Sequence, residues 1–293
     1  MQTVHTISEL RAFVNVHKMK GHRVGFVPTM GNLHDGHLTL ITEAKRQSDI
    51  VICSIFVNPM QFGANEDLDS YPRTLEADSQ ALISKGCDLL FAPNANEVYP
   101  KGLAEQTRVD VPVLGNFHCG ASRPGHFVGV ATVVAKLFNM VQADVAFFGE
   151  KDFQQLAIIK KMATDLCFPV DIVGIPTSRE ASGLARSSRN GYLSPAEKET
   201  AANLYRVLQE TKQAIIDGER DFSLLSDKAK QALTALGFEP DYFNIAHPMT
   251  LEASKTSDTE FVLLTAAKLG NTRLIDNLSL ANHVQRIAPE KMD

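Results

Sequence analysis

The stretch RVGFVPTMGNLHDGHLTLITEAKRQS (residues 23–48) passes from an apolar run, through a turn rich in glycine and histidine, into a helical pattern. The run at 23–27 is almost continuously apolar, which is typical of a strand covered on both faces. From residue 37 onward, apolar residues recur at helical spacing. The stretch therefore predicts a strand, a tight turn and a helix, which together begin a βαβ unit.

The same alternation continues to residue 175. Strands that alternate with helices form parallel sheets with right-handed crossovers. The sequence therefore predicts an α/β fold, with a Rossmann-like parallel-sheet domain over residues 1–177. The further strand runs are 49–57, 87–93, 144–148 and 170–175, and the further helical segments are 74–86, 126–142 and 152–167.

The pattern changes after Pro176. The segment SREASGLARSSRNGYLSP is rich in Ser, Arg and Gly, which indicates a hinge or mobile loop. A helical region follows at 195–237, and then three short strand candidates within 241–280. Helices followed by consecutive strands predict a smaller α+β domain, so we expect a C-terminal α+β lid domain over residues 178–293.

Composition limits the class of protein. The 293 residues, 44% of them hydrophobic, can bury a substantial core. A net charge of −5 argues against a broad basic surface for nucleic acid. No run approaches the roughly 18 apolar residues of a membrane span, and the N-terminal residues lack the pattern of a signal peptide. The four cysteines are scattered as in reduced proteins, so we expect a cytoplasmic protein without a zinc site.

The turn PTMGNLHDGH follows the first predicted strand, at the edge where open parallel sheets bind ligands. Gly31 lets the backbone turn, and Gly36 lets a phosphate approach the free N–H groups of the next helix. His34 and His37 share one face if this helix begins near Asp35. Two imidazoles there can donate hydrogen bonds to a phosphate as negative charge develops. Alone, an H-x-x-H pair is more often a pair of surface histidines, and a metal site would need a third ligand besides Asp35.

Two more strand ends carry polar residues. FVNPMQF supplies Asn58 and Gln61, neutral groups that can hold hydroxyls. FFGEKDFQQL supplies Lys151, which can meet phosphate, and Asp152, which can cap the helix or help hold a metal. The alternative for this second segment is a solvated charge pair.

The segment GLARSSRNGY places two serines between Arg186 and Arg189. This is the composition expected of a flap that folds over phosphates, and a solvated linker is the alternative.

These segments together, with YPRT and ASRPGHF, resemble in order and spacing the pantothenate synthetases, or pantoate-β-alanine ligases. The resemblance runs from about Thr6 to Asn277. This family belongs to the HxGH nucleotidyltransferases, whose histidine signature binds ATP and stabilises transfer at the α-phosphate. The resemblance implies ATP-dependent condensation of (R)-pantoate with β-alanine through a pantoyl-adenylate, which gives pantothenate, AMP and pyrophosphate. It also implies Mg²⁺ and a homodimer, and it assigns no protein residue as a metal ligand.

The resemblance further implies roles for single residues. His37 is the general acid or charge stabiliser with His34 beside it, and Lys151 and Arg189 are further catalytic groups. The implied ATP-binding residues are Met30, Gly31, Asn32, Leu33, His34, Asp35, Gly36, His37, Gly149, Glu150, Lys151, Asp152, Ser178, Arg186, Ser187, Ser188 and Arg189.

Gln61 and Gln155 match the pantoate-binding pair, with Gln61 also near β-alanine. Arg123 is a structural or active-site arginine. Two positions depart from the family pattern: Arg186 stands where Leu or Met is usual, and Cys119 where Glu is common. We expect the Arg186 side chain to point to solvent, with only its backbone near the nucleotide.

The chemistry of the residues agrees with this resemblance. Adenylation of a carboxylate brings two anions together, so the site needs cations such as Lys151, Arg189 and Mg²⁺ near a helix N-terminus. A different HxGH enzyme, such as a pantetheine-phosphate adenylyltransferase, would keep the histidines without needing the Gln61 and Gln155 pair. A nucleotide-sensing module without catalysis is the other alternative, and the joint presence of the histidines, lysine and arginine argues against it.

Overall fold

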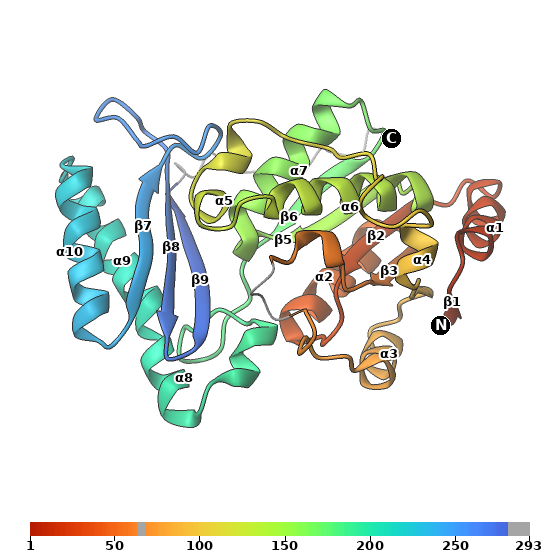
Figure 1. The fold of residues 1–293 in the computed structure, drawn as a ribbon, viewed down its shortest axis with the longest axis horizontal. Coiled ribbons are helices and arrows are strands. Elements are labelled where there is room, and N and C mark those ends of the chain that lie inside the picture. The colour runs from red at the N-terminus through yellow and green to blue at the C-terminus, as the bar shows by residue number, and fades with distance from the viewer. Residues whose placement is uncertain (64–67, 281–293) are drawn as a thin grey trace. The chain divides into compact units, whose positions relative to one another are not determined.

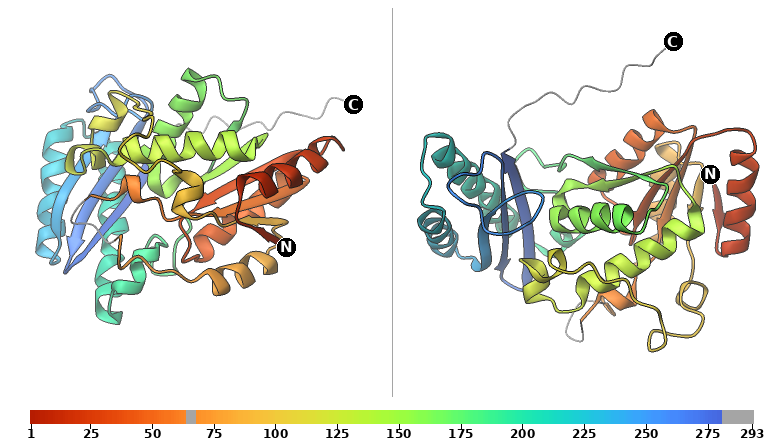
Figure 2. Two further views of the ribbon diagram at one scale, coloured as in Figure 1. Left: turned by 45° about the vertical axis from the view of Figure 1, so that its right-hand side comes forward. Right: turned by 90° about the horizontal axis from the view of Figure 1, so that it is seen from above.

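The structure, a computed structural model, describes residues 1–63 and 68–280 (Figures 1 and 2). The chain forms two compact units, Met1–Glu199 and Thr200–Asp293. The boundary predicted after residue 177 lies before this division, because the following loop makes its contacts within the first unit.

A six-stranded sheet forms the centre of the first unit, in the order β1-β4-β3-β2-β5-β6. All of its pairings are parallel, so the predicted α/β class is confirmed. The predicted strands match β2 to β6 within two residues at each end. The strands are β1 (Gln2–Val4), β2 (Val24–Thr29), β3 (Ile50–Ile55), β4 (Leu89–Phe91), β5 (Val145–Gly149) and β6 (Asp171–Ile175).

Strand β1 and helix α1 (Ile7–Lys18) were not predicted. The strand has three residues, too few for a clear pattern, and it forms the sheet edge beside β4. A local signal does mark α1, since Thr6 Oγ1 accepts the Glu9 N–H and Glu9 closes a capping box. The glycine and histidine turn therefore follows the second strand of the chain, where we had expected the first.

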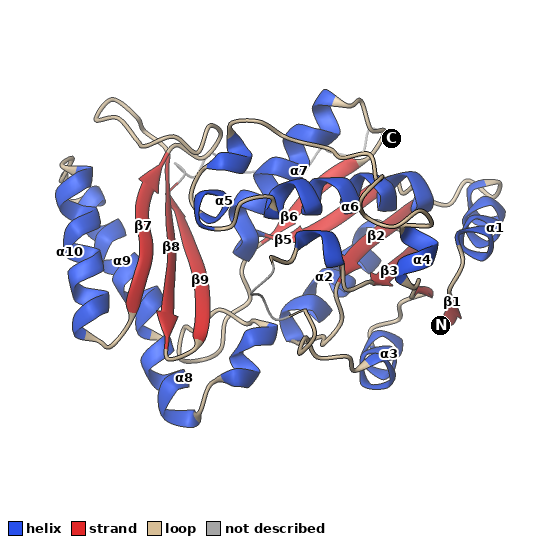
Figure 3. Cartoon of the chain, in the orientation of Figure 1, coloured by secondary structure: helices blue, strands red, loops and turns tan. Residues whose placement is uncertain are grey.

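The strands on the two sides of β2 come from different parts of the chain. From β2 it runs to β3 and β4, and it later returns to place β5 and β6 on the other side of β2 (Figure 3). Open parallel sheets bind ligands beyond the carboxyl ends of the strands at such a switch point. The segments that follow β2 and β5 are the PTMGNLHDGH turn and the GEKD turn, so topology brings these two motifs to one edge.

Right-handed crossovers in opposite directions place helices on opposite faces of a sheet. Helix α2 packs on α3, while α6 packs on both α1 and α7, as this rule requires (Figure 1). Strands β2, β3 and β5 are buried over nearly their whole length because both faces are covered. These helices are α2 (Asp35–Gln47), α3 (Leu75–Ser84), α6 (His126–Val141) and α7 (Phe153–Asp165).

Short helical turns connect the longer elements of the first unit. Turn η1 follows β3, turn η3 follows β5 and turn η4 lies in the loop after β6. None of the described helices is long and apolar enough to cross a bilayer. The short turns are η1 (Pro59–Gln61), α4 (Ala95–Val98), η2 (Leu114–Asn116), α5 (Cys119–Ser122), η3 (Glu150–Asp152) and η4 (Ser188–Tyr192).

The second unit has a three-stranded antiparallel sheet in the order β7-β8-β9. Helix α10 packs on β7 and helix α9 packs on β9, so the predicted α+β architecture is confirmed. The central strand β8 is buried along nearly all of its length. Helix α8 (Pro195–Ala201) spans the boundary between the units. The elements of the second unit are α9 (Asn203–Ile216), α10 (Phe222–Ala235), β7 (Glu239–Ala246), β8 (Phe261–Leu269) and β9 (Thr272–Leu280).

Candidate active site

The turn after β2 is held by a buried carboxylate. Gly31 has φ +84° and Asn32 has φ +50°, so the backbone passes through the left-handed region that favours glycine. The N–H groups of Asn32 and Leu33 donate to the Asp78 carboxylate at 2.9 and 2.8 Å. Asp78 is 3% exposed, and Thr74 Oγ1 also donates to it at 3.2 Å. Sequence reasoning missed Asp78, because its partners lie more than 40 residues away.

The two histidines stand at the first turn of α2. His34 is the residue before the helix, and its ring centroid lies 4.0 Å from that of His37. His34 Nδ1 accepts the Gly36 N–H at 3.1 Å, and His37 Nδ1 accepts the His34 N–H at 3.4 Å. Of the N–H groups in the first turn of this helix, that of Gly36 is therefore occupied by a side chain.

These contacts determine the tautomers. Because a backbone N–H can only donate, each Nδ1 is unprotonated and each neutral ring carries its proton on Nε2. Burial lowers the pKa of His34 to about 4 and that of His37 to about 3. At neutral pH the pair therefore offers uncharged Nε2–H donors, and it does not act as two cations.

Lys151 is brought to the histidines by the turn after β5. Its positive charge contributes to the lowered pKa of both His34 and His37, after burial in each case. Asp152 precedes helix α7, and its Oδ1 lies 3.6 Å from Lys151 Nζ instead of capping the helix. The turn after β5 thus lies close enough to the histidines for the charge of Lys151 to lower the pKa of both rings.

The loop after β6 reaches the same turn. Arg186 N–H donates to Ser178 O at 2.9 Å, which closes a small hairpin. Ser188 Oγ then donates to Asn32 O at 3.2 Å. These bonds place the serines of the loop beside the segment that follows β2.

Arg186 does not point to solvent, so that expectation is wrong. Its Nη1 lies 2.9 Å from Asp35 Oδ2, and its side chain is only 32% exposed. The ion pair forms because Asp35 opens helix α2, the helix onto which the loop folds. Beyond it, Ser187 Oγ accepts the Arg189 N–H at 3.2 Å and so begins turn η4, which carries the half-buried Arg189.

Gln61 ends turn η1 and is linked to the β2 turn. Its Oε1 accepts from Asn58 Nδ2 at 3.0 Å, and its Nε2 lies 3.3 Å from Met30 Sδ. Its backbone oxygen lies 2.9 Å from His126 Nδ1, and His126 Nε2 lies 2.9 Å from Arg123 Nη1. Arg123 therefore supports the segment that carries Gln61.

Gln155 lies half-buried in α7, and turn η1 and α7 both contact α6. Its neighbour Gln154 is 5% exposed and holds the preceding loop: its Oε1 accepts the Cys119 N–H at 3.1 Å. Its Nε2 donates to Leu114 O at 2.8 Å. Cys119, the second departure from the family pattern, is thus held through its backbone by Gln154, and the residue is buried.

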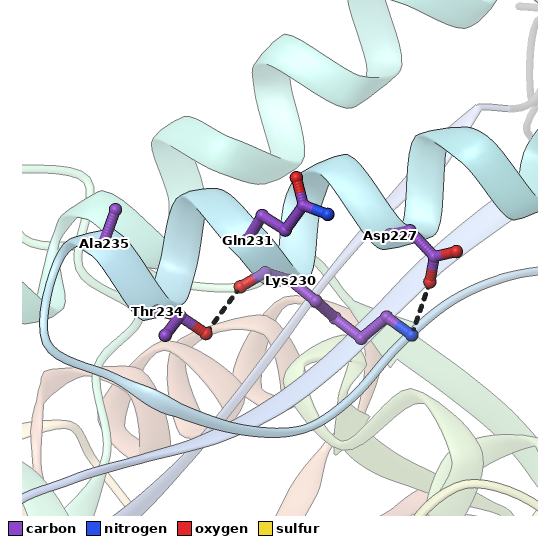
Figure 4. A pocket seen from close by; sticks show the side chains of 5 residues that line it. All are labelled: Asp227, Lys230, Gln231, Thr234 and Ala235. Carbon is purple, nitrogen blue, oxygen red and sulfur yellow. Dashed lines mark hydrogen bonds and ion pairs between the residues drawn. The ribbon is translucent and has the colours of Figure 1, made fainter.

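Groups of metal ligands and hollows away from the strand ends are the other places where a site could lie. Among residues 1–63 and 68–280, no group of three or more His, Cys, Asp or Glu side chains could hold a metal ion. A shallow depression on α10 is lined by side chains that pair within the helix (Figure 4). There Lys230 Nζ lies 2.8 Å from Asp227 Oδ1, and Thr234 Oγ1 donates to Lys230 O at 3.0 Å.

Several known sequences are similar to this chain over nearly its whole length. The family model for pantoate-beta-alanine ligase matches residues 2–279. The pantothenate synthetase of Marinobacter nauticus is 56% identical over 280 residues, which are 96% of this chain and 99% of that protein. That of Pseudomonas fluorescens is 58% identical over 280 residues, which are 96% of this chain and 98% of that protein.

Solved structures are similar to this chain as well. The pantothenate synthetase of Thermus thermophilus matches with a TM-score of 0.88 and 48% identity over 95% of this chain and 99% of that one. The pantoate-beta-alanine ligase of Francisella tularensis, solved with beta-gamma ATP and β-alanine, matches with a TM-score of 0.80 and 35% identity over 95% of this chain and 97% of that one. The chain belongs to the pantoate-beta-alanine ligase family.

Proposed function

We propose that the residues grouped at the β2 and β5 strand ends catalyse the reaction of this family. The chain is a ligase that condenses (R)-pantoate with β-alanine through a pantoyl-adenylate and releases AMP and pyrophosphate. The observation that carries the assignment is the meeting of His34, His37 and Lys151 at the switch point. Preorganised donors and a cation at one point are what transfer at a phosphate requires.

In the first step, a pantoate carboxylate oxygen attacks the α-phosphorus of ATP. The new O–P bond forms as the bond to the bridging oxygen breaks, and pyrophosphate leaves with the electron pair. We assign Lys151 and Arg189 to the negative charge of the phosphates, and the Nε2–H donors of His34 and His37 to the charge that develops at the α-phosphate. The ATP site comprises residues 30–37 and 149–152, with Ser178, Arg186, Ser187, Ser188 and Arg189 from the loop after β6.

In the second step, the neutral amine of β-alanine attacks the acyl carbon of the adenylate. The C–N bond forms, the amine loses a proton, and AMP leaves with the electrons of the C–O bond. We assign Gln61 and Gln155 to pantoate, and Gln61 also to β-alanine. Positioning alone can supply roughly 7 to 11 kcal/mol, so the step needs no covalent enzyme intermediate.

Mg²⁺ fits the donor set of this site. The ion binds through one or two carboxylates together with phosphate oxygens and waters. Asp152 offers such a carboxylate, since its side chain is 46% exposed beside Lys151. Bound there with ATP, Mg²⁺ would neutralise phosphate charge.

We also propose that the enzyme works in the cytoplasm as a homodimer. The family resemblance supports the dimer, and four free thiols suit a reducing compartment.

The test of the proposed function is pantoate-dependent exchange of pyrophosphate into ATP without β-alanine. We expect exchange with purified protein and Mg²⁺, because the adenylate forms reversibly. Full reaction without exchange would rule out a freely reversible adenylate, and the absence of both activities would overturn the assigned function. Phosphopantetheine in place of pantoate serves as the control for a different HxGH enzyme.

A further inference from the structure

The side-chain amide of Asn58 has only one possible orientation. Asn58 is 1% exposed, so its polar atoms must bond within the protein. The Met60 N–H can only donate and lies 3.3 Å from Asn58 Oδ1, while Gly129 O can only accept and lies 3.2 Å from Asn58 Nδ2. These two backbone groups therefore decide which end of the amide is oxygen and which is nitrogen.

Gly129 makes this arrangement possible. A Cβ at this position would lie 2.5 Å from Met60 O and 2.7 Å from Gln61 Cα. Only a glycine lets helix α6 approach turn η1 closely enough to present its carbonyl to Asn58.

Tyr99 is the third group that determines the orientation of the Asn58 amide. Its hydroxyl lies 2.7 Å from Asn58 Oδ1 and must donate, because the amide oxygen carries no proton. Tyr99 is 3% exposed, and burial raises the pKa of its phenol well above the usual range, so the phenol keeps its proton. Asn58 Oδ1 thus accepts from two donors, and this leaves Nδ2 to face Gln61.

The orientation of Asn58 determines the orientation of Gln61. Since Asn58 Nδ2 donates to Gln61 Oε1, the oxygen of the Gln61 amide is already used. Its Nε2 is directed toward Met30, whose thioether sulfur is a weak acceptor. Gln61 therefore presents an NH₂ donor to a ligand at the end of the β2 turn.

We propose that Asn58 and Tyr99 are positioning residues that orient the Gln61 amide, so that the pantoate subsite contains a hydrogen-bond donor facing a carboxylate or hydroxyl oxygen of the substrate. This inference rests on the proposed assignment of Gln61 to pantoate. The order of donation runs from the Tyr99 hydroxyl to Asn58 and from Asn58 to Gln61, and neither positioning residue touches the substrate.

The test is a comparison of Tyr99→Phe with Gln61→Ala in the exchange assay. Tyr99→Phe keeps the buried ring and removes one hydrogen bond, so we expect the pantoate KM to rise about three- to tenfold with the ATP KM unchanged. In the Gln61→Ala background, Tyr99→Phe should change the pantoate KM by less than about twofold, because the residue it positions is gone. Tyr205→Phe, in the second unit, is the matched control and should leave both KM values unchanged.

A second variant tests which end of the Gln61 amide, NH₂ or oxygen, faces the substrate. Asn58→Asp has the size of asparagine but cannot donate to Gln61 Oε1, so the Gln61 amide should turn and present its oxygen to pantoate. We expect Asn58→Asp to raise the pantoate KM at least as much as Asn58→Ala. If Asn58 served only to fill space, the pantoate KM of Asn58→Asp would be nearly normal.

The outcomes separate the two levels of the proposal. A normal pantoate KM in Gln61→Ala would overturn the assignment of Gln61 to pantoate. If Gln61→Ala is impaired, additive effects of Tyr99→Phe and Gln61→Ala, or equal effects of Tyr99→Phe on the pantoate and ATP KM, would overturn the positioning role alone.

Discussion

The turn that follows β2 and the turn that carries Gln61 are constructed in different ways. The first is organised mainly within consecutive residues, where two rings cap a helix and glycine supplies the backbone conformation. The distant groups Asp78 and Ser188 also bond to its backbone. The second is a short 3-10 turn whose key side chain is oriented by Asn58, Tyr99 and the backbone of α6. Because the first turn carries the histidines and the second carries Gln61, changes in the first should affect transfer at the phosphate. Changes in the second should affect the binding of pantoate.

The largest effect is expected at the charge-stabilising residues. His37→Ala and Lys151→Ala should each lower the rate of adenylation about 10²- to 10³-fold, or roughly 3 to 4 kcal/mol, as for other preorganised donors. Single-turnover formation of the adenylate with saturating pantoate measures this rate. His17→Ala, in α1, is the control, and a wild-type rate in either variant would refute its assigned role.

The second largest effect is expected at Asp78, the carboxylate that holds the turn after β2. Asp78→Asn places an NH₂ group where the carboxylate accepts the N–H groups of Asn32 and Leu33, so one of these bonds is lost. Hydrogen bonds to charged groups contribute about 1.5 to 3 kcal/mol, so kcat/KM for ATP should fall roughly 10- to 100-fold. The pantoate KM should change little.

Asp88→Asn is the matched control for Asp78→Asn. Its carboxylate also accepts a backbone N–H, that of Val51 at 2.7 Å, and pairs with Lys45 at 2.9 Å. These contacts lie at the amino ends of β3 and β4, away from the strand ends that form the site. Asp88→Asn should lower the melting temperature without changing the ATP KM, and equal ATP defects in the two variants would contradict the role of Asp78.

The pH dependence of stability tests the neutral state of the histidines. In the unfolded chain His34 should titrate near 6.5, whereas burial and the nearby Lys151 lower its pKa to about 4 in the folded protein. The unfolded state binds more protons at this site between these values, so the contribution of His34 to the free energy of unfolding should fall as the pH drops from above 6.5 towards 4, and then level off.

His34→Asn isolates this contribution, since asparagine can cap the helix without titrating in this range. Unfolding of the variant should take up about one proton fewer between pH 4 and 6.5. The unfolding constant of the wild type should therefore change by up to about tenfold more per pH unit than that of the variant. Urea midpoints at several pH values measure the slope. Parallel curves for the variant and the wild type would show that His34 is not held neutral.

The smallest effect is expected at Arg186. The ion pair with Asp35 is partly exposed, and such pairs contribute about 0 to 1 kcal/mol. Arg186→Leu should therefore change kcat/KM for ATP by less than about tenfold, and raised salt should weaken the wild-type advantage. Arg189→Leu, measured in parallel, should cost far more, and an equal loss in both variants would make Arg186 a phosphate contact.

Prediction from the sequence succeeded where the signal was local. Strands β2 to β5 were found because continuous apolar runs mark strands covered on both faces. The run of β6 is also apolar, although this edge strand is buried only at its last two residues. The meeting of His34 with Lys151 was found because parallel strands present their carboxyl ends at one edge. The three-residue strand β1 was missed because so short a run has no period.

The sequence by itself determined the order of strands β2 to β6 with the long helices between them, the turn chemistry of the HxGH segment and the family. The elements and the turn follow from local backbone preferences and from the period of apolar residues. The family follows from the resemblance of several motifs in order and spacing along nearly the whole chain. Only the tertiary structure decided which distant groups pair: Asp78 with the turn and Tyr99 with Asn58 in the interior, and Asp35 with Arg186 where both are partly exposed. These pairs could not be read from the sequence, because a buried donor or acceptor bonds to whichever group packing brings beside it, and that group can be distant in the chain.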